Sequence, residues 1–524
     1  MGAAALLLDS TLGTRLRAAS AAASMGPSTT VTPYLLPSLA EGVDVTSLLT
    51  VADLPADNGY RMVGIPDGLG AFDNGDGTFT LLMNHELGST AGIVRAHGSK
   101  GAFVSEWEIR KSDMHVLSGR DFTPSAAHVY NWSAGGYVTG TTAWQRFCSA
   151  DLADPTAFGY RGLGTGERIY LNGEESDAGR AYAHIATGPN RGESWQLPKL
   201  GRLAWENAVA SPHPQEKTIV VCLDDGDLST AATTPAPCEI FVYVGTKTSE
   251  GNEIERAGLT NGKLYGMQVT VGGNPVLEEH VSNVLGVASI INQGQFSLVA
   301  MGTGGDVSAL SAAQITADSV TKGLLRMRRI EDGAWDPRAD RANDFYFVTT
   351  ANVTTPSRLW RLRFNDIENP EAGGTLTNLL PNDSAPKMMD NICIDSLGRI
   401  LIQEDVGGND LIGRVWLYGI ESGDLIEIAH HDPARFTPGA PGFMTNDEES
   451  SGIIDAKAIL GHGWFLLDVQ NHRPIPAAGE PADPYGLVQH GQLLAMYVDP
   501  DIGRDRKSRR PWADTQPGQL GRAS

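Results

Sequence analysis

Short apolar runs that end in polar, ligand-type side chains recur along the whole chain. The run Ile169–Leu171 follows a glycine turn and stops at two adjacent carboxylates, Glu174 and Glu175. β-Branched and aromatic residues between glycines predict a strand, and an apolar strand has no packing use for two acids at its tip. The other runs with such ends are 79–88, 201–210, 218–227, 344–353, 398–408 and 463–472. The sequence therefore predicts seven strands that carry oxygen or nitrogen ligands at their ends.

The spacing of these strands predicts an all-β fold. Only residues 306–322 show apolar positions near a period of 3.6 residues, so we expect one short helix there. Glycine-containing turns at 73–77 and 395–399 predict hairpins. Over 524 residues, short strands with a degenerate repeat of about 40–50 residues favour a β-propeller over a sandwich or barrel. We expect six blades with loop insertions, and five or seven blades are the alternatives.

One large domain accounts for most of the chain in this interpretation. Residues 1–30 are expected to be a flexible tail or a leader remnant, 31–500 the propeller, and 501–524 a second tail. The alanine-rich segment 19–24 resembles the end of a processed leader, which predicts export to the periplasm or the cell exterior. No run approaches about 18 uninterrupted apolar residues, so no transmembrane span is expected.

The charge balance is strongly acidic and narrows the range of partners. There are 62 acidic and 40 basic residues, which gives a formal net charge of −22. Nucleic acid is not an expected partner, because a phosphate backbone requires a basic face. The acidity has two explanations: a plainly solvated surface, or carboxylates neutralised by bound cations, since hard cations take several oxygens each.

The four cysteines do not have the spacing of a structural zinc site, because no two of them form a CxxC pair. Cys222 and Cys238 lie on two predicted strands, on either side of residues 228–237. In an exported protein they could form a disulfide, and the alternative is two buried thiols. Cys148 is either a small core residue or a ligand for a soft metal.

A propeller would bring the acidic strand ends together, because the first strand of every blade runs along a central channel. Packed carboxylates repel one another, and a metal ion relieves that repulsion. Calcium suits carboxylate and amide oxygens, whereas a thiolate indicates a softer metal such as iron. The sequence therefore predicts calcium at the axis and, if Cys148 is a ligand, iron.

The order of the polar motifs resembles that of the PhoX-type alkaline phosphatases and related propellers, from Asp53 to His472. The motifs are Asn84-His85-Glu86, Gly173-Glu174-Glu175, Trp205-Glu206, Arg329-Ile330-Glu331-Asp332-Gly333, Asp390-Asn391 and Val469-Gln470-Asn471-His472. The resemblance implies a six-bladed propeller whose iron and calcium centre hydrolyses phosphate monoesters. One departure is Ile330, which stands where the family has proline.

The resemblance also implies roles for individual residues. The expected iron ligands are Glu86 and Cys148, and the expected calcium or bridging ligands are Glu174, Glu175, Glu206 and Glu331, with Glu404 or Asp405 completing the set. Arg329, together with Glu331, would act on the substrate, since a guanidinium fork suits phosphate oxygens. A surface ion pair is the alternative role of Arg329.

Two functions of different classes follow from this interpretation. One is a metal-dependent phosphatase that acts on small phosphate esters. The other is a calcium-stabilised surface or assembly propeller that self-associates and does not catalyse a reaction. A third possibility is a calcium-dependent hydrolase of the lactonase type, which would need neither iron nor Cys148.

Overall fold

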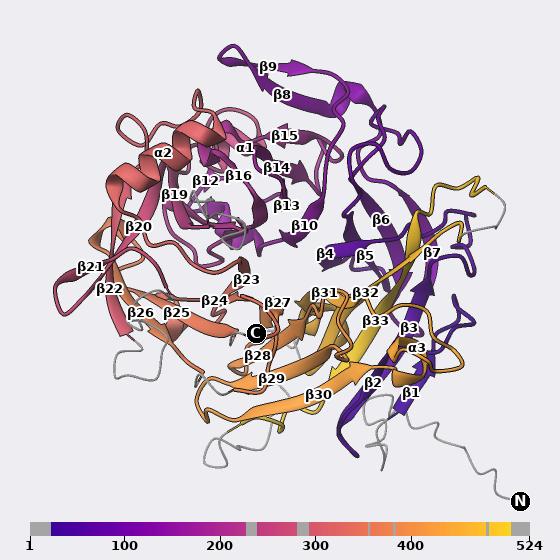
Figure 1. Ribbon diagram of the computed structural model, residues 1–524. Helices are drawn as coiled ribbons and strands as arrows, with labels where there is room; N and C mark the ends of the chain where they lie inside the picture. Colours follow the sequence, from indigo (N-terminus) through magenta and orange to yellow (C-terminus); the bar gives the residue numbers. More distant parts are fainter. Residues whose placement is uncertain are drawn as a thin grey trace, which may run out of the picture.

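Six blades, each built on four antiparallel strands, surround one axis (Figure 1). The computed structural model of the chain describes residues 22–226, 238–279, 293–354, 357–380, 384–477 and 482–504. The first three blades are β4 (Pro66–Asp73), β5 (Thr78–His85), β6 (Phe103–Arg110) and β7 (His115–Asp121); β10 (Phe147–Asp151), β13 (Ile169–Glu174), β14 (Gly179–Ile185) and β15 (Ser194–Gln196); and β17 (Trp205–Ala210), β18 (Lys217–Asp224), β19 (Ile240–Thr246) and β20 (Lys263–Val271).

The other three blades complete the ring. They are β23 (Ile330–Trp335), β24 (Asp344–Thr349), β25 (Arg358–Phe364) and β26 (Gly374–Asn378); β27 (Met389–Ile394), β28 (Arg399–Glu404), β29 (Arg414–Gly419) and β30 (Leu425–His431); and β31 (Glu448–Asp455), β32 (Trp464–Pro474), β33 (Gln489–Val498) and β3 (Val43–Thr50). The first strands β4, β10, β17, β23, β27 and β31 contact one another in this order, and β31 contacts β4. The expected six-bladed, all-β propeller is therefore confirmed.

An apolar cluster fills each of the six interfaces between neighbouring blades. Between the fourth and fifth blades, for example, Tyr346 and Val348 of β24 belong to the same cluster as Ile400 and Ile402 of β28. Alternate residues of one strand face opposite sides of a sheet, so both faces of each blade are buried against its neighbours. The apolar runs read from the sequence are the strands that form these interfaces.

The last blade takes its outermost strand from the beginning of the described chain. β33 pairs antiparallel with β32 on one side and with β3 on the other. β1 (Ala22–Met25) extends this sheet as a parallel neighbour of β3. The hydroxyl of Thr29 forms hydrogen bonds with the hydroxyl of Thr50 (2.8 Å) and with the carboxylate of Asp53 (2.7 Å). Residues 22–30 therefore belong to the propeller, which corrects the expected tail, while 1–21 and 505–524 lie outside the described residues.

Insertions enlarge several blades. β22 (Gln293–Ala300) pairs with both β20 and β26 and so joins the third and fourth blades into one sheet. The hairpin of β8 (Val129–Ser133) and β9 (Gly136–Thr139) extends the second blade, because β8 pairs with β15. The remaining short strands are β2 (Leu35–Pro37), β11 (Gly159–Tyr160), β12 (Leu163–Gly164), β16 (Arg202–Leu203) and β21 (Asn274–Val276).

The expected helix is present but shorter than predicted. α2 (Ala312–Lys322) begins after Ser311, whose side chain and Gln314 form a capping box that fixes the start six residues beyond the expected one. The other α-helices of the described residues are single turns: α1 (Glu253–Arg256), α3 (Pro433–Phe436) and α4 (Lys457–Leu460). No helix in the part of the chain described here is long and apolar enough to cross a membrane.

The four cysteines are all free and buried. Cys222 packs in the cluster between the second and third blades, and Cys238 packs in the cluster between the third and fourth. The two thiols therefore lie on opposite faces of the third blade. Of the two alternatives for this pair, a disulfide or two buried thiols, the structure shows two buried thiols.

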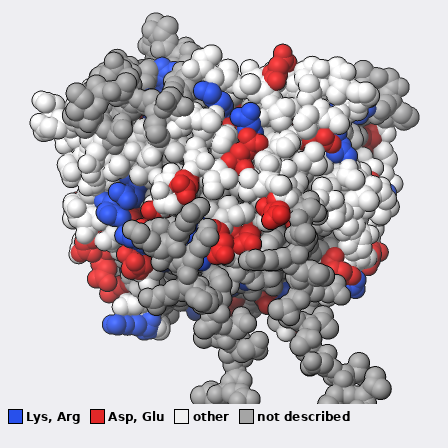
Figure 2. Space-filling view, turned by 90° about the horizontal axis from the view of Figure 1, so that it is seen from below, with Lys and Arg blue, Asp and Glu red and all other residues white. Residues whose placement is uncertain are grey.

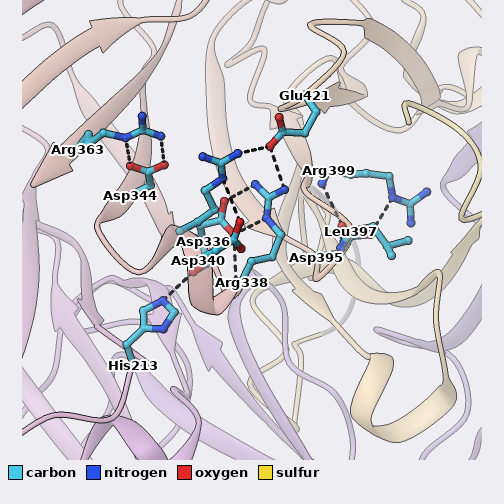
Figure 3. A network of polar contacts seen from close by, with 11 residues as sticks. His213, Asp336, Arg338, Asp340, Asp344, Arg363, Asp395, Leu397, Arg399 and Glu421 are labelled. Atoms are coloured by element: carbon cyan, nitrogen blue, oxygen red, sulfur yellow. Dashed lines mark hydrogen bonds and ion pairs between the residues drawn. The ribbon is translucent and has the colours of Figure 1, made fainter. Parts of the chain in front are cut away.

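Ion pairs tie three neighbouring blades together at the end of the ring away from the starts of the first strands (Figure 3). Nε2 of His213, in the β17–β18 connection, donates to the carbonyl of Asp336 just after β23 (2.9 Å). Arg338 pairs with Asp336 (2.6 Å) and with Glu421 of the β29–β30 turn (3.2 Å). Charged side chains at this end of the ring connect neighbouring blades.

Candidate metal centre

One carboxylate or thiol occupies the same place in all six first strands, namely the second residue of the strand. These residues are Asp67, Cys148, Glu206, Glu331, Asp390 and Glu449. All six are buried, with at most 8% of the residue exposed. Because the first strands surround the axis, the ring of blades becomes a ring of ligand-type side chains at one end of the channel.

β-Bulges accompany this ring. In five blades the pairing of the first and second strands shifts register at the ligand-type residue, for example between Asp67 and Leu69 and between Trp205 and Asn207. In the last blade the shift falls a little later, between Ser451 and Ile454. A bulge turns a side chain out of the regular alternation of a strand. The repeated bulge thus aims one side chain per blade at its neighbours around the axis.

The residues that directly follow the second strands form the outer part of the centre. Their backbone N–H groups bond to the carbonyl of the residue that precedes the first strand, at 2.8–2.9 Å in five blades. The five residues are Glu86, Glu175, Asp225, Thr350 and Asp405. The strand ends that the sequence marked as acidic are therefore held next to the first strands by a repeated backbone contact.

Nine side chains of the two sets make four groups of possible metal ligands, with atoms within 4.8 Å of one another in each group. The groups are Asp67, Glu86 and Cys148; Cys148, Glu175 and Glu206; Glu206, Glu331 and Asp390; and Asp390, Asp405 and Glu449. Cys148, Glu206 and Asp390 each belong to two groups. The groups therefore form one continuous chain that runs from the first blade to the sixth.

Burial raises the pKa of the acids in this chain of groups, and the neighbouring carboxylates raise it further. This holds for Asp67, Glu175, Glu206, Glu331, Asp390 and Glu449. Burial likewise raises the pKa of the Cys148 thiol, with the charge of Asp67 next in importance. Charging these groups together is unfavourable without cations between them, and cations of opposite charge remove that cost.

The donors present fit metal ions. Oδ1 of Asp390 is buried and accepts no hydrogen bond from the described residues, so it has an unused lone pair in the middle of the chain of groups. Nε2 of Gln470 donates to Asp67 (3.0 Å), Glu86 (3.1 Å) and Glu449 (3.3 Å) and orients carboxylates of the first and last blades. Carboxylate oxygens suit calcium, and the thiol of Cys148 suits a softer metal.

Arg329 lies at the edge of the ring, as a residue that directly precedes β23. Its Nη2 pairs with Asp225 (3.1 Å) and with Glu331 (2.9 Å), and 31% of its side chain is exposed whereas those carboxylates are nearly buried. The charge of Glu331 raises the pKa of the guanidinium above its usual value, so Arg329 stays charged at every working pH. A fixed, partly open cation beside metal ligands can bind an anion.

Two of the expected ligands lie outside the four groups. Glu174 pairs with Arg180 (2.5 Å). Glu404 accepts hydrogen bonds from the indole of Trp416 (2.9 Å) and from the backbone of Lys387 (2.7 Å). Each is the last residue of a second strand, and neighbouring residues of a strand point to opposite sides. We therefore correct the expectation: Glu175 and Asp405 reach the centre, and Glu174 and Glu404 do not.

Eight of the 62 acidic residues of the protein belong to the four ligand groups at the axis. On the side of the molecule shown in Figure 2, acidic and basic side chains of the described residues lie in small groups without a broad basic area. These buried carboxylates favour the second explanation of the acidic composition, carboxylates neutralised by bound cations, which stays a prediction. The expectation that nucleic acid is not a partner stays a prediction.

The fold and the centre together define a six-bladed β-propeller with an acidic, thiol-containing ring at one end of its channel. No protein-family model and no curated protein sequence matches the chain. The chain is similar to the solved structure of PhoX from Pseudomonas fluorescens in complex with vanadate, a transition-state analogue, with a TM-score of 0.61 and 14% identity over 90% of this chain and 97% of that one. At this identity the similarity shows a PhoX-like fold and no more.

Two other solved structures have lower similarity. One is the α-L-arabinofuranosidase Arb93A of Fusarium graminearum, with a TM-score of 0.37 and 8% identity over 83% of this chain and 93% of that one. The other is a gluconolactonase of Xanthomonas campestris, with a TM-score of 0.31 and 12% identity over 86% and 98%. These scores are too low to carry an argument about function.

Proposed function

We propose that the protein is a metal-dependent hydrolase of phosphate monoesters. The observation that carries this proposal is the connected chain of nine ligand-type side chains from all six blades, with Arg329 at its edge. PhoX, whose fold the chain shares, was solved with vanadate, an analogue of a transition state. The proposal transfers phosphoryl chemistry to this chain on the strength of the similar fold and of the ligand-type side chains gathered at the axis of this propeller.

The carboxylates would hold hard cations such as calcium, and Cys148 with Glu86 and Asp67 would favour a softer metal such as iron. Bound metal ions polarise a phosphoryl group and provide a nucleophilic oxygen near neutral pH. The buried carboxylates keep the ligand geometry fixed, because their backbone is anchored by the repeated bulges and strand-end contacts. The centre would therefore need little reorganisation during the reaction.

Arg329 would bind the phosphoryl oxygens of the substrate. Its guanidinium is held by Asp225 and Glu331 and is partly exposed, so an anion can approach it without displacing the side chain. A planar guanidinium donates two parallel hydrogen bonds to a phosphoryl group and stabilises charge that develops on the oxygens. Glu331 positions Arg329 and also belongs to the third ligand group.

The test is the hydrolysis of p-nitrophenyl phosphate by protein supplied with calcium and iron. We expect turnover that a chelator abolishes and that vanadate inhibits. Arg329→Met should reduce kcat/KM by about a hundredfold or more, as expected for the loss of a charge-assisted contact to the transition state. Arg363→Met is the matched control, because Arg363 pairs with Asp344 (2.5 Å) at the opposite end of the blades.

The absence of turnover in protein that carries its metals would contradict the proposed reaction. The calcium-stabilised propeller without catalysis would then account for the centre, because bound cations would still offset the repulsion between buried carboxylates. That outcome would be recognised by an elemental analysis showing calcium, with a melting temperature that falls on chelation.

A further inference from the structure

Arg146 has the same position in the second blade that Arg329 has in the fourth. Each arginine directly precedes the first strand of its blade and stands two residues before a ligand-type residue, Cys148 or Glu331. Both arginines have a left-handed backbone, with φ of 44° and 52°. The sequence pattern did not single out Arg146, because the two arginines share no motif beyond this spacing.

The left-handed turn itself belongs to the repeat of the propeller and not to arginine. Ile65 and Met388 precede the first strands of the first and fifth blades with φ of 50° and 46°. At these four equivalent positions only Arg146 and Arg329 are charged. Residues other than glycine rarely adopt this left-handed backbone conformation, so the fold maintains it at the centre at a cost in conformational free energy.

Like Arg329, Arg146 pairs with two carboxylates of the centre, one of which follows the second strand of the preceding blade. Its Nε donates to Glu86 (2.8 Å) and its Nη2 pairs with Glu175 (2.5 Å). Both carboxylates belong to ligand groups and have 9% of their side chains exposed, whereas the Arg146 side chain is 47% exposed. A guanidinium has five N–H donors, and these contacts use only those of Nε and Nη2. The partly exposed guanidinium of Arg146 therefore has N–H groups that can donate to a further acceptor.

The two arginines flank one ligand. Glu175, which pairs with Arg146, and Glu331, which pairs with Arg329, both have oxygen atoms within 4.8 Å of Glu206. The cationic side chains thus lie on either side of the part of the centre contributed by the third blade. An oxyanion bound over Glu206 and its metals would have one guanidinium on each side.

We propose that Arg146 is a second phosphate-binding residue and forms a clamp with Arg329 around the phosphoryl group. The identity of the anion rests on the proposed function, but the clamp itself rests on the equivalence of the two positions. Two guanidinium groups bind a tetrahedral oxyanion more tightly and in a more defined orientation than one. The clamp would favour phosphate monoesters, which offer enough unsubstituted oxygens for both guanidinium groups, over diesters.

The experiment measures the binding of inorganic phosphate to metal-loaded protein by calorimetry. We expect R146M to raise the Kd for phosphate about tenfold to a hundredfold, as for the loss of a charge-assisted hydrogen-bonding pair, with the metal content unchanged. R146K, which keeps the charge but not the fork, should lose part of this affinity. R180M is the matched control, because Arg180 pairs with Glu174 (2.5 Å) outside the ligand groups.

The outcomes separate the clamp from the reaction. The clamp would be overturned by an unchanged Kd for phosphate in R146M, or by a loss of phosphate binding that lost metal explains. Hydrolysis by the unmodified protein would support the proposed function in either case. If the protein has no turnover but binds phosphate through Arg146, the clamp would be supported and the proposed hydrolase activity would be contradicted. Equal affinity for phosphate and for a dialkyl phosphate would contradict the expected preference for monoesters.

Discussion

The thiol of Cys148 lies 3.4 Å from Oδ2 of Asp67, so the first strands of two neighbouring blades meet through these side chains. The two residues are equivalent in position, since each is the second residue of its strand. Cys148 is the one thiol among the nine ligand-type residues. The first strand of the second blade therefore contributes a thiol, a softer ligand, where the first strands of the other five blades contribute a carboxylate.

We expect Cys148→Ser to reduce the bound iron by at least half while calcium is largely retained. A hydroxyl is a poor ligand for a soft metal, and Cys148 belongs to two of the four ligand groups. Elemental analysis of the purified protein measures this change. Cys393→Ser is the control, because Cys393 is a buried thiol of β27 that belongs to none of the groups. Equal iron in both variants would show that Cys148 is a core residue.

Glu175→Gln should lower the bound metal, whereas Glu174→Gln should not. The second variant weakens the contacts of Glu174 with Arg180 and with the backbone of Gln145, at a cost of about 1–3 kcal/mol in stability. The two substitutions are adjacent and chemically identical, so each controls for the other. Metal content is measured by elemental analysis and stability by urea unfolding. Loss of metal from Glu174→Gln alone would reverse the assignment.

A side chain at Gly68 should disrupt the contact between the first and second blades. A Cβ at this position would lie 2.5 Å from the backbone nitrogen of Ala150, and backbone cannot yield as a flexible side chain can. We expect Gly68→Ala to destabilise the protein by roughly 2 kcal/mol or more, measured by urea unfolding. Gly136→Ala should have little effect, because nothing lies within 4 Å of its Cβ position. Equal stability of the two variants would contradict the close approach.

Lys247 makes stability depend on pH far from the metal centre. Burial lowers the pKa of its ammonium from 10.5 to about 8, while Nζ donates to the carbonyl of Lys217 (2.7 Å). Between the folded and unfolded pKa values the unfolded chain binds more protons, so stability rises as pH increases from about 8 to about 10.5 and falls as pH decreases through the same range.

Lys247→Met should therefore be more stable than the unmodified protein at pH 7, by roughly 1–3 kcal/mol after the lost hydrogen bond is counted. It should also lack the alkaline rise in stability. Urea unfolding at several pH values measures both effects. Lys100→Met, at an exposed lysine, should leave the profile unchanged. An alkaline rise that persists in Lys247→Met would assign it to another group.

The sequence predicted the ligand-type residues that follow the second strands better than those at the second position of the first strands. Glu175 and Asp405 follow apolar runs that stop abruptly, which is a local signal. Asp67 and Glu449 are the second residues of their strands and precede small residues, so neither stands at the end of an apolar run. Asp67 and Glu449 meet only because the sixth blade lies beside the first, a contact between residues far apart in the chain.

Which member of an acidic pair reaches the metal centre could not be read from composition. In Glu174-Glu175 and Glu404-Asp405 the first residue ends the strand and the second lies just beyond it. Resolving the pair requires the strand boundary to within one residue, and single-sequence patterns define boundaries less closely than that. Length and strand spacing favoured six blades without deciding between five, six and seven, and the contacts of the six first strands around the axis decide the count.

The pairing of β33 with β3 sets the order in which the protein can mature. Five blades are complete before the ribosome reaches residue 489, but the sixth has its place only after β33 has joined the late strand β32 to the early strand β3. Gln470 cannot bridge Glu449 and Asp67 until that seam has formed. A product that ended before β33 would therefore leave the sixth blade without its join to β3, and the ring of ligand-type side chains between Asp67 and Glu449 would stay open.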